Sequence, residues 1–81
     1  MKPVTIFSTE TCGYCKMAKD FFQKNNVEFQ EFDVGHDLAK RQEMIEKSGQ
    51  MGVPVITVGD DLIVGFNKAR LQELLAIPAV A

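Results

Sequence analysis

Hydrophobic residues recur along the chain at two spacings, one typical of β-strands and the other of α-helices. Short runs rich in β-branched and aromatic residues cover positions 4–7, 27–34, 55–58 and 62–64. Between and after these runs, apolar residues recur three or four positions apart over 14–24 and 68–75, and residues 38–47 have a thinner apolar stripe that also fits a helix. The predicted order of elements is therefore βαβαββα.

Residues that favour helix caps lie at the ends of the three helical patterns. Asn25 follows the first pattern, and Asp37 and Gly49 stand where the second helix would begin and end. Asn67 is placed to cap the third helix, and Pro78 is expected to stop it. The helix bounds are thus predicted from local chemistry as well as from periodicity.

The predicted elements can form one mixed sheet with helices around it. The second helix has only a thin apolar stripe, Leu38, Met44 and Ile45, so we expect it to be peripheral. Gly59-Asp60-Asp61 indicates a hairpin between the last two strands, which should be antiparallel, whereas the first two are joined through a helix and should be parallel. We therefore expect a single α/β domain over residues 1–81, with three helices flanking a four-stranded mixed sheet.

Composition and charge argue against several classes of partner. Of the 81 residues, 46% are hydrophobic and 25% are charged, and the net charge is −2 with both signs interspersed. No basic run or basic amphipathic face suggests a nucleic acid or a membrane surface as a partner. Residues 1–12 lack the apolar core of a signal peptide, so the reducing cytoplasm is the expected compartment.

Cys12 and Cys15, the only cysteines in the chain, form a CxxC motif between the first strand and the first helix. At helical spacing their Cα atoms would be about 5–6 Å apart, a distance that a disulfide tolerates. A structural disulfide would not persist in the cytoplasm, and so short a loop would constrain the unfolded chain little. A CxxC pair in a βαβ context is instead typical of a redox-active dithiol.

The two sulfur atoms are expected to differ in reactivity. Cys12 falls at the helix N-cap, where unpaired N–H groups near Tyr14 and Cys15 and the positive end of the helix dipole favour its thiolate. Cys15 should be more buried and should have the higher pKa. Lys16 and Lys19 would add modest positive potential, or they are ordinary solvated residues. The asymmetry suits an attacking thiol and a resolving thiol.

Two metal-based alternatives have less support. A zinc site needs about four ligands, and the chain offers two cysteines and one histidine, His36, which we expect to be a solvated loop residue. An iron–sulfur cluster would need ligands from a second chain or from small thiols. We therefore expect no bound metal and no tightly bound cofactor. A dimeric iron–sulfur carrier stays as the non-enzymatic alternative.

A second motif, SGQMGVPVI, places Val53 and Pro54 immediately before the third strand. Proline is tolerated at the first residue of a strand, so one interpretation is a rigid entry turn. The other is a cis-proline loop that faces the cysteine pair, where the backbone of Val53 would bind an incoming peptide or glutathione. The CxxC motif and the order of elements favour the second interpretation.

On these motifs the sequence resembles the glutaredoxins, of the thioredoxin-fold superfamily, along essentially its whole length. TCGYCKMAKDFF resembles the active-site helix of that family, GQMGVPVI resembles its TVP loop, and VGF stands where its Gly-Gly pair lies. The resemblance implies a thioredoxin-like fold, with Cys12 as the nucleophile and Cys15 as the resolving thiol. It also implies that Tyr14 lines the site and that Val53 and Pro54 form the substrate-binding loop.

Several positions depart from the family pattern. Gly13 replaces the proline of the TCPYC motif, which loosens the turn. Thr9 stands where many glutaredoxins have a lysine that pairs with the glycine carboxylate of glutathione. Phe66 replaces the second glycine, and Asn67-Lys68 replaces the residues that hold the γ-glutamyl group, so Phe66 would either fill part of that groove or pack in the core. Gly65 and Phe66 resemble redoxins of the NrdH type, which thioredoxin reductase reduces.

The sequence therefore predicts a monomeric thiol–disulfide oxidoreductase that reduces protein or glutathione mixed disulfides through Cys12 and Cys15. Glutathione is one expected reductant. The alternative is an NrdH-type redoxin that is reduced by thioredoxin reductase. The candidate substrate-binding residues are Gly13, Tyr14, Val53, Pro54, Gly65 and Phe66.

Overall fold

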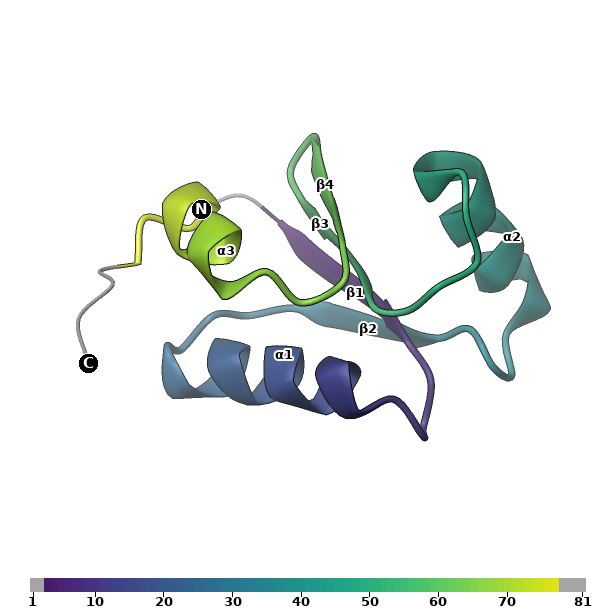
Figure 1. The fold of residues 1–81 in the computed structure, drawn as a ribbon, viewed down its shortest axis with the longest axis horizontal. Coiled ribbons are helices and arrows are strands. Elements are labelled where there is room, and N and C mark those ends of the chain that lie inside the picture. The colour runs from purple at the N-terminus through teal and green to yellow at the C-terminus, as the bar shows by residue number, and fades with distance from the viewer. Residues whose placement is uncertain (1–2, 78–81) are drawn as a thin grey trace.

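The computed structural model describes residues 3–77 and contains the predicted order of elements (Figure 1). The strands are β1 (Val4–Ser8), β2 (Gln30–Asp33), β3 (Val55–Val58) and β4 (Asp61–Val64). The helices are α1 (Gly13–Lys24), α2 (Leu38–Ser48) and α3 (Lys68–Leu74). None of the helices in this part of the chain is long and apolar enough to cross a membrane. Pro78, the predicted stop of the last helix, lies outside the described residues.

The four strands form one mixed sheet in the order β2-β1-β3-β4. β1 and β2 are parallel, whereas β3 is antiparallel to both β1 and β4, so the predicted strand directions are confirmed. The turn between β3 and β4 is shorter than predicted, because Asp61 belongs to β4 and pairs with Val58. Gly59, at φ +59°, supplies the left-handed conformation that such a tight turn needs.

Helices cover both faces of the sheet (Figure 1). α1 and α3 pack on one face, and their apolar side chains join Ile6 of β1 in the larger core cluster. α2 packs on the other face, where Met44 joins Phe7, Val34 and Val55 in a smaller cluster. Successive side chains of a strand point to opposite faces, so the neighbours Ile6 and Phe7 enter different clusters.

The strand β2 is shorter than the hydrophobic pattern predicted. The pattern covers positions 27–34, but the strand contains only Gln30–Asp33. The N–H of Val27 donates a hydrogen bond to the carbonyl of Phe22 at 2.8 Å, which ties this residue to the end of α1 and not to the sheet. The buried side chain of Val27 therefore reaches the core from a loop.

The apolar stripe on α2 is thinner than predicted. Met44 is buried and Ile45 is half-buried, but Leu38 is 69% exposed. Leu38 lies six residues before Met44, and at 3.6 residues per turn the two side chains point about 120° apart around the helix axis. Leu38 is therefore off the buried face. The predicted C-cap is confirmed, since Gly49 adopts a left-handed conformation with φ +72°.

Candidate active site

Three segments with candidate site residues leave the sheet at the same edge. In the pairing of β1, β3 and β4, Phe7 lies opposite Val55, and Val55 lies opposite Val64. The CxxC turn follows β1, Val53-Pro54 precedes β3, and Gly65-Phe66 follows β4. Pairing in the sheet therefore brings together segments that are far apart in the sequence.

The peptide bond between Val53 and Pro54 is cis. This agrees with the interpretation of the segment as a cis-proline loop. Pro54 is buried, and Val53 packs partly buried against the smaller core cluster. The carbonyl of Pro54 accepts a hydrogen bond from the N–H of Gly65 at 2.8 Å. Gly65 has φ +87°, a conformation that a side chain would strain, so glycine suits this connection. The role of Val53 in substrate binding stays a prediction.

The first turn of α1 holds the two cysteines in different environments. Cys12 is the N-cap of the helix, as predicted, and it is half-buried. Its Sγ accepts a hydrogen bond from the N–H of Cys15 at 3.1 Å. Cys15 is completely buried, and both residues are free thiols. The turn thus presents one sulfur toward solvent and encloses the other.

Burial is the main reason why the pKa of the Cys15 thiol is raised to about 12. The hydrogen bond and the charge of Cys12 act in the same direction, whereas the backbone of Thr9 and the charge of Lys19 act against it. Cys15 is therefore a protonated thiol at neutral pH. The sequence-based expectation of a buried second thiol with a raised pKa is confirmed.

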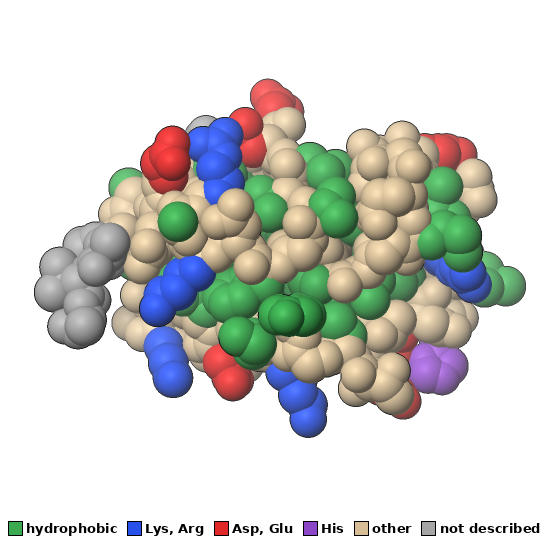
Figure 2. Space-filling view, in the orientation of Figure 1, with side chains coloured by type: hydrophobic (Ala, Val, Ile, Leu, Met, Phe, Trp, Pro, Cys, Tyr) green, Lys and Arg blue, Asp and Glu red, His purple; other side chains and the backbone are tan. Residues whose placement is uncertain are grey.

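Exposed apolar side chains lie beside the cysteines. Tyr14 is 64% exposed and Met17 is 50% exposed, and together with Gly13 they line a shallow hollow at the start of α1. Figure 2 shows hydrophobic side chains gathered in the middle of this face, with Lys or Arg side chains to the left of them and below them. An apolar surface of this kind can bury apolar groups of another molecule next to the reactive sulfur.

Phe66 packs in the core, which is one of the two roles that its sequence position suggested, and its place in a glutathione groove stays a prediction. Its ring makes an edge contact with Phe21, with 5.9 Å between the ring centroids, and it packs partly buried against the larger core cluster. It also lines a groove of about 290 Å³ that includes Met17. Phe66 therefore belongs to the core on one side and to the surface near the cysteines on the other.

Lys19 has a defined partner, contrary to the interpretation of an ordinary solvated residue. Its Nζ lies 2.7 Å from Oε2 of Glu31, and the same oxygen accepts a hydrogen bond from Oγ of Ser8 at 2.7 Å. The Lys19 and Ser8 hydrogen bonds lower the pKa of Glu31. The charge of Lys19 is thus held in one place, from which it lowers the pKa of Cys15.

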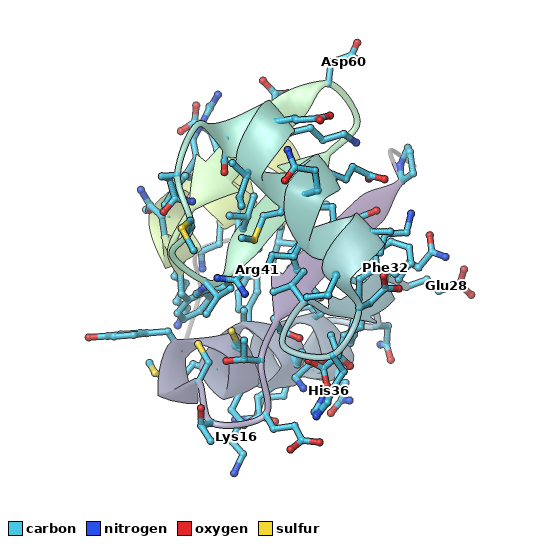
Figure 3. All side chains as sticks on the ribbon, turned by 90° about the vertical axis from the view of Figure 1, so that its right-hand side faces the viewer. Lys16, Glu28, Phe32, His36, Arg41 and Asp60 are labelled. Carbon is cyan, nitrogen blue, oxygen red and sulfur yellow. The ribbon has the colours of Figure 1, made fainter. Side chains whose placement is uncertain are left out.

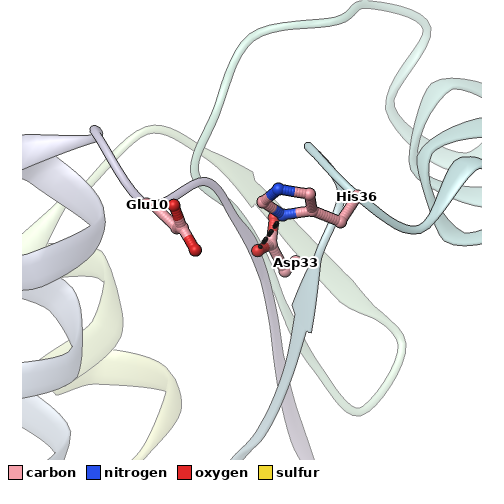
Figure 4. A group of neighbouring side chains, drawn as sticks. All are labelled: Glu10, Asp33 and His36. Atoms are coloured by element: carbon pink, nitrogen blue, oxygen red, sulfur yellow. Dashed lines mark hydrogen bonds and ion pairs between the residues drawn. The ribbon is translucent and has the colours of Figure 1, made fainter.

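His36 lies in an ion pair on the loop between β2 and α2. Its Nδ1 is 2.8 Å from Oδ2 of Asp33, which raises the pKa of His36 and lowers that of Asp33. Glu10 completes a group whose potential ligand atoms all lie within 4.8 Å of one another (Figure 4). The imidazole–carboxylate pair accounts for the contact of His36 with Asp33, and the charge of Glu10 also raises the pKa of His36. Neither cysteine belongs to the group.

Arg41 is a further cation near the sheet edge where the three candidate site segments meet, and the sequence did not single it out. Figure 3 shows Arg41 between α2 and the N-terminal end of α1, where Lys16 is labelled. Among residues 3–77, no ion pair involves Arg41. No sequence signal could have found it, because the direction of a side chain on α2 depends on how that helix packs on the sheet.

Comparisons with known proteins agree with this geometry. A family model described as Glutaredoxin matches residues 4–63. Glutaredoxin 3 of Escherichia coli is 42% identical over 82 residues, covering 93% of this chain and 99% of that protein. The glutaredoxin-like protein NrdH of Lactococcus lactis is 32% identical over 74 residues, covering 88% of this chain and 97% of that protein. The crystal structure of a mutant thioredoxin-like protein superposes with a TM-score of 0.89 at 31% identity, covering 96% of this chain and 100% of that protein. The predicted thioredoxin-like fold is confirmed.

Proposed function

Since the chain belongs to the glutaredoxin family of thiol–disulfide oxidoreductases, we propose that it reduces protein disulfides or glutathione mixed disulfides through Cys12 and Cys15. The observation that carries the proposal is the contrast between the two thiols. The sulfur of Cys12 lies at a helix N-terminus and accepts a hydrogen bond from the N–H of Cys15, while the side chain of Cys15 is buried and protonated. This contrast supports an attacking role for Cys12 and a resolving role for Cys15.

The proposed reaction transfers two electrons to the client. The Cys12 thiolate attacks one sulfur of the client disulfide, forms a mixed disulfide and displaces the other client sulfur as a thiolate. Cys15 then loses its proton to solvent or to the displaced thiolate and attacks the sulfur of Cys12. This step closes the Cys12–Cys15 disulfide and releases the second client thiolate. The client is reduced, and the protein is left oxidised.

The electrostatics of Cys15 favour this order of steps. Two of the causes that raise its pKa, the hydrogen bond and the charge of Cys12, come from the attacking sulfur itself. Once Cys12 is bonded in a mixed disulfide, its sulfur carries no negative charge, so the pKa of Cys15 falls. The charge of Lys19 still favours the Cys15 thiolate. Formation of the mixed disulfide therefore activates the thiol that resolves it.

The convergence of three segments at one sheet edge supports a substrate site around Cys12. The backbone of the cis-proline segment and the apolar surface of α1 offer strand-like hydrogen bonds and apolar contacts. The proposal requires no tightly bound cofactor and places the protein in the reducing cytoplasm. The residues proposed to contact the substrate are Gly13, Tyr14, Val53, Pro54, Gly65 and Phe66.

The reductant distinguishes two forms of the proposal. Reduction by glutathione is supported by the CGYC and GVP motifs. Reduction by thioredoxin reductase, as in NrdH-type redoxins, is supported by Phe66, whose ring fills space where a glycine would leave a groove open. Thr9 also lacks the positive charge that a lysine would offer to the glycine carboxylate of glutathione.

Two experiments test the proposal. The first measures reduction of the oxidised protein by glutathione and, separately, by NADPH with thioredoxin reductase. The second compares Cys12→Ser, which should abolish disulfide reduction, with Cys15→Ser, which should accumulate a mixed disulfide detectable by mass spectrometry. Full activity of the Cys12 variant would rule out the mechanism. Reduction by only one of the two systems would identify the reductant.

A further inference from the structure

The α1–α3 groove, a hollow of about 290 Å³ on the surface beside the cysteines, combines apolar and basic side chains. We propose that it binds the part of a client polypeptide that flanks the disulfide, and that it selects an apolar residue followed by acidic residues. The inference rests on the proposed disulfide reduction and adds the class of client to it. The groove is lined by Met17, Asp20, Phe21, Lys24, Phe66 and Lys68.

The floor of the α1–α3 groove is apolar. Phe21 and Phe66 meet edge to face there, with centroids 5.9 Å apart, and the half-exposed side chain of Met17 lies beside them. A polar ligand would gain little from such a floor. An aliphatic or aromatic side chain placed on it would remove apolar surface from water on both partners. The first requirement on the client is therefore an apolar side chain.

The rim of the α1–α3 groove carries positive charge that the protein itself does not neutralise. Lys24 and Lys68 are both exposed, and neither takes part in an ion pair among residues 3–77. Asp20 is the only acidic residue of the lining, so the groove has one net positive charge in a chain of net charge −2. Lys19, Lys40, Lys47 and Arg70, by contrast, each have a carboxylate partner. Carboxylates of a client would complement the two free lysines.

The groove is continuous with the reactive turn, because Met17 also lines the hollow formed by Gly13 and Tyr14. At 1.5 Å per residue, Met17 lies about 7.5 Å and Lys24 about 18 Å along the helix axis from Cys12. An extended client chain rises about 3.3 Å per residue. It would therefore bring a side chain about two residues from its cysteine to Met17, and side chains about five to six residues away to Lys24.

Synthetic peptides can test this selection. Each peptide carries one cysteine joined by a disulfide to 5-thio-2-nitrobenzoate, whose release is followed by absorbance. All carry leucine two positions from the cysteine. They differ in having a pair of Glu, Gln or Lys residues five and six positions away, and each peptide is made in both chain directions. At low salt, kcat/KM for the Glu peptide should exceed that for the Gln peptide by about 3–10-fold in one direction. High salt should reduce the difference, and replacing leucine by serine should lower kcat/KM.

Charge-reversal variants assign the preference to the groove. Lys24→Glu and Lys68→Glu should each reduce or invert the preference for the Glu peptide over the Lys peptide. The matched control is Lys47→Glu, an equal charge change on α2 near the β3–β4 hairpin, which should keep the wild-type preference. Lys24 ends α1, so Lys24→Gln, with circular dichroism as a check of folding, provides a second variant at that position.

The outcomes separate this inference from the proposed function. Equal reduction of the Glu, Gln and Lys peptides by the wild-type protein would overturn the selection of acidic clients while leaving disulfide reduction intact. A preference that survives in both Lys24→Glu and Lys68→Glu would overturn the assignment to the α1–α3 groove. Failure to reduce any of the peptides would overturn both the inference and the proposed function.

Discussion

The backbone N–H of Cys15 donates a hydrogen bond to Sγ of Cys12 across 3.1 Å. One peptide group therefore stabilises the accessible sulfur, while the side chain on the same residue is buried and kept protonated. The first turn of a helix makes this arrangement natural, because its N–H groups lack intrahelical acceptors. Two identical side chains three positions apart thus acquire different chemistry from backbone geometry.

In the reduced native protein at neutral pH, iodoacetamide should modify Cys12 and leave Cys15 unmodified. The thiolate is the reactive form, and the pKa of Cys15 is raised by burial from 9.0 to about 12. Mass spectrometry should find one label in the native protein and two in denaturant. Two labels in the native protein would contradict the burial and protonation of Cys15.

The same shift makes stability depend on pH. Because the folded pKa of Cys15 is raised, the buried thiol contributes stability below pH 9, and this contribution is lost as the pH rises toward 12.

Replacing Gly13 by proline should raise the free energy of unfolding by about 0.4–1 kcal/mol, because proline restricts the unfolded chain. Gly13 is the first residue of α1, where proline is favoured, and a Cβ there would meet nothing within 4 Å. Cys12 before it has φ −86° and ψ 111°, an extended conformation that a following proline allows.

Urea unfolding of the Gly13→Pro variant measures this gain, and Gly13→Ala is the matched control. Alanine adds a Cβ and some backbone restriction but does not fix φ, so its effect should be smaller. A proline variant that is less stable than the alanine variant would show that the start of α1 does not tolerate the fixed φ of proline.

Local chemistry explains why so much of the fold could be predicted. The side chain of Asp37 accepts a hydrogen bond from the N–H of Lys40, and that of Asn67 accepts one from Arg70, so helix starts are encoded within four residues. The start of β2 could not be predicted in this way. It is set by the parallel pairing of Thr5 with Gln30, and this pairing depends on where β1 can reach.

The same distinction holds for the candidate site. The spacing of Cys12 and Cys15 was sufficient to predict their different environments, because both lie in one helical turn. The contact of His36 with Asp33 lies within one short segment, but that of Lys19 with Glu31 joins a helix to a strand twelve positions away. Side chains that meet across elements leave no spacing in the sequence by which they could be recognised.

Replacing Glu31 by alanine should lower the free energy of unfolding by about 1–2 kcal/mol. Ser8 is only 1% exposed, and its hydroxyl would lose its acceptor. The ion pair with Lys19 adds less than about 1 kcal/mol, because both side chains are partly exposed. In a Ser8→Ala background the loss should be smaller, and a double-mutant cycle measured by urea unfolding gives the coupling. Additive effects would contradict a shared hydrogen bond.

The stabilisation by Glu31 should depend on pH. The hydrogen bonds from Lys19 and Ser8 lower the pKa of Glu31 below its ordinary value of 4.5. The ionised carboxylate therefore contributes stability above pH 4.5, and this contribution is lost as the pH falls through the lowered pKa. Thermal unfolding of the wild type and of Glu31→Gln should differ at neutral pH and converge in acid. A difference that is independent of pH would contradict this assignment.

Replacing Phe66 by alanine should change both stability and the choice of reductant. The ring packs on Phe21 at 5.9 Å and is partly buried, so its loss should lower the free energy of unfolding by about 2 kcal/mol, less than for a fully buried phenylalanine. The same change opens the space that the ring fills beside the cysteines.

If the ring of Phe66 obstructs the γ-glutamyl group of glutathione, kcat/KM for reduction of the Phe66→Ala variant by glutathione should rise relative to kcat/KM for its reduction by thioredoxin reductase. Phe66→Leu, which keeps most of the apolar volume, is the control and should retain the wild-type ratio. An unchanged ratio in Phe66→Ala would mean that the ring serves the core alone, and that the reductant is chosen by other residues at this edge.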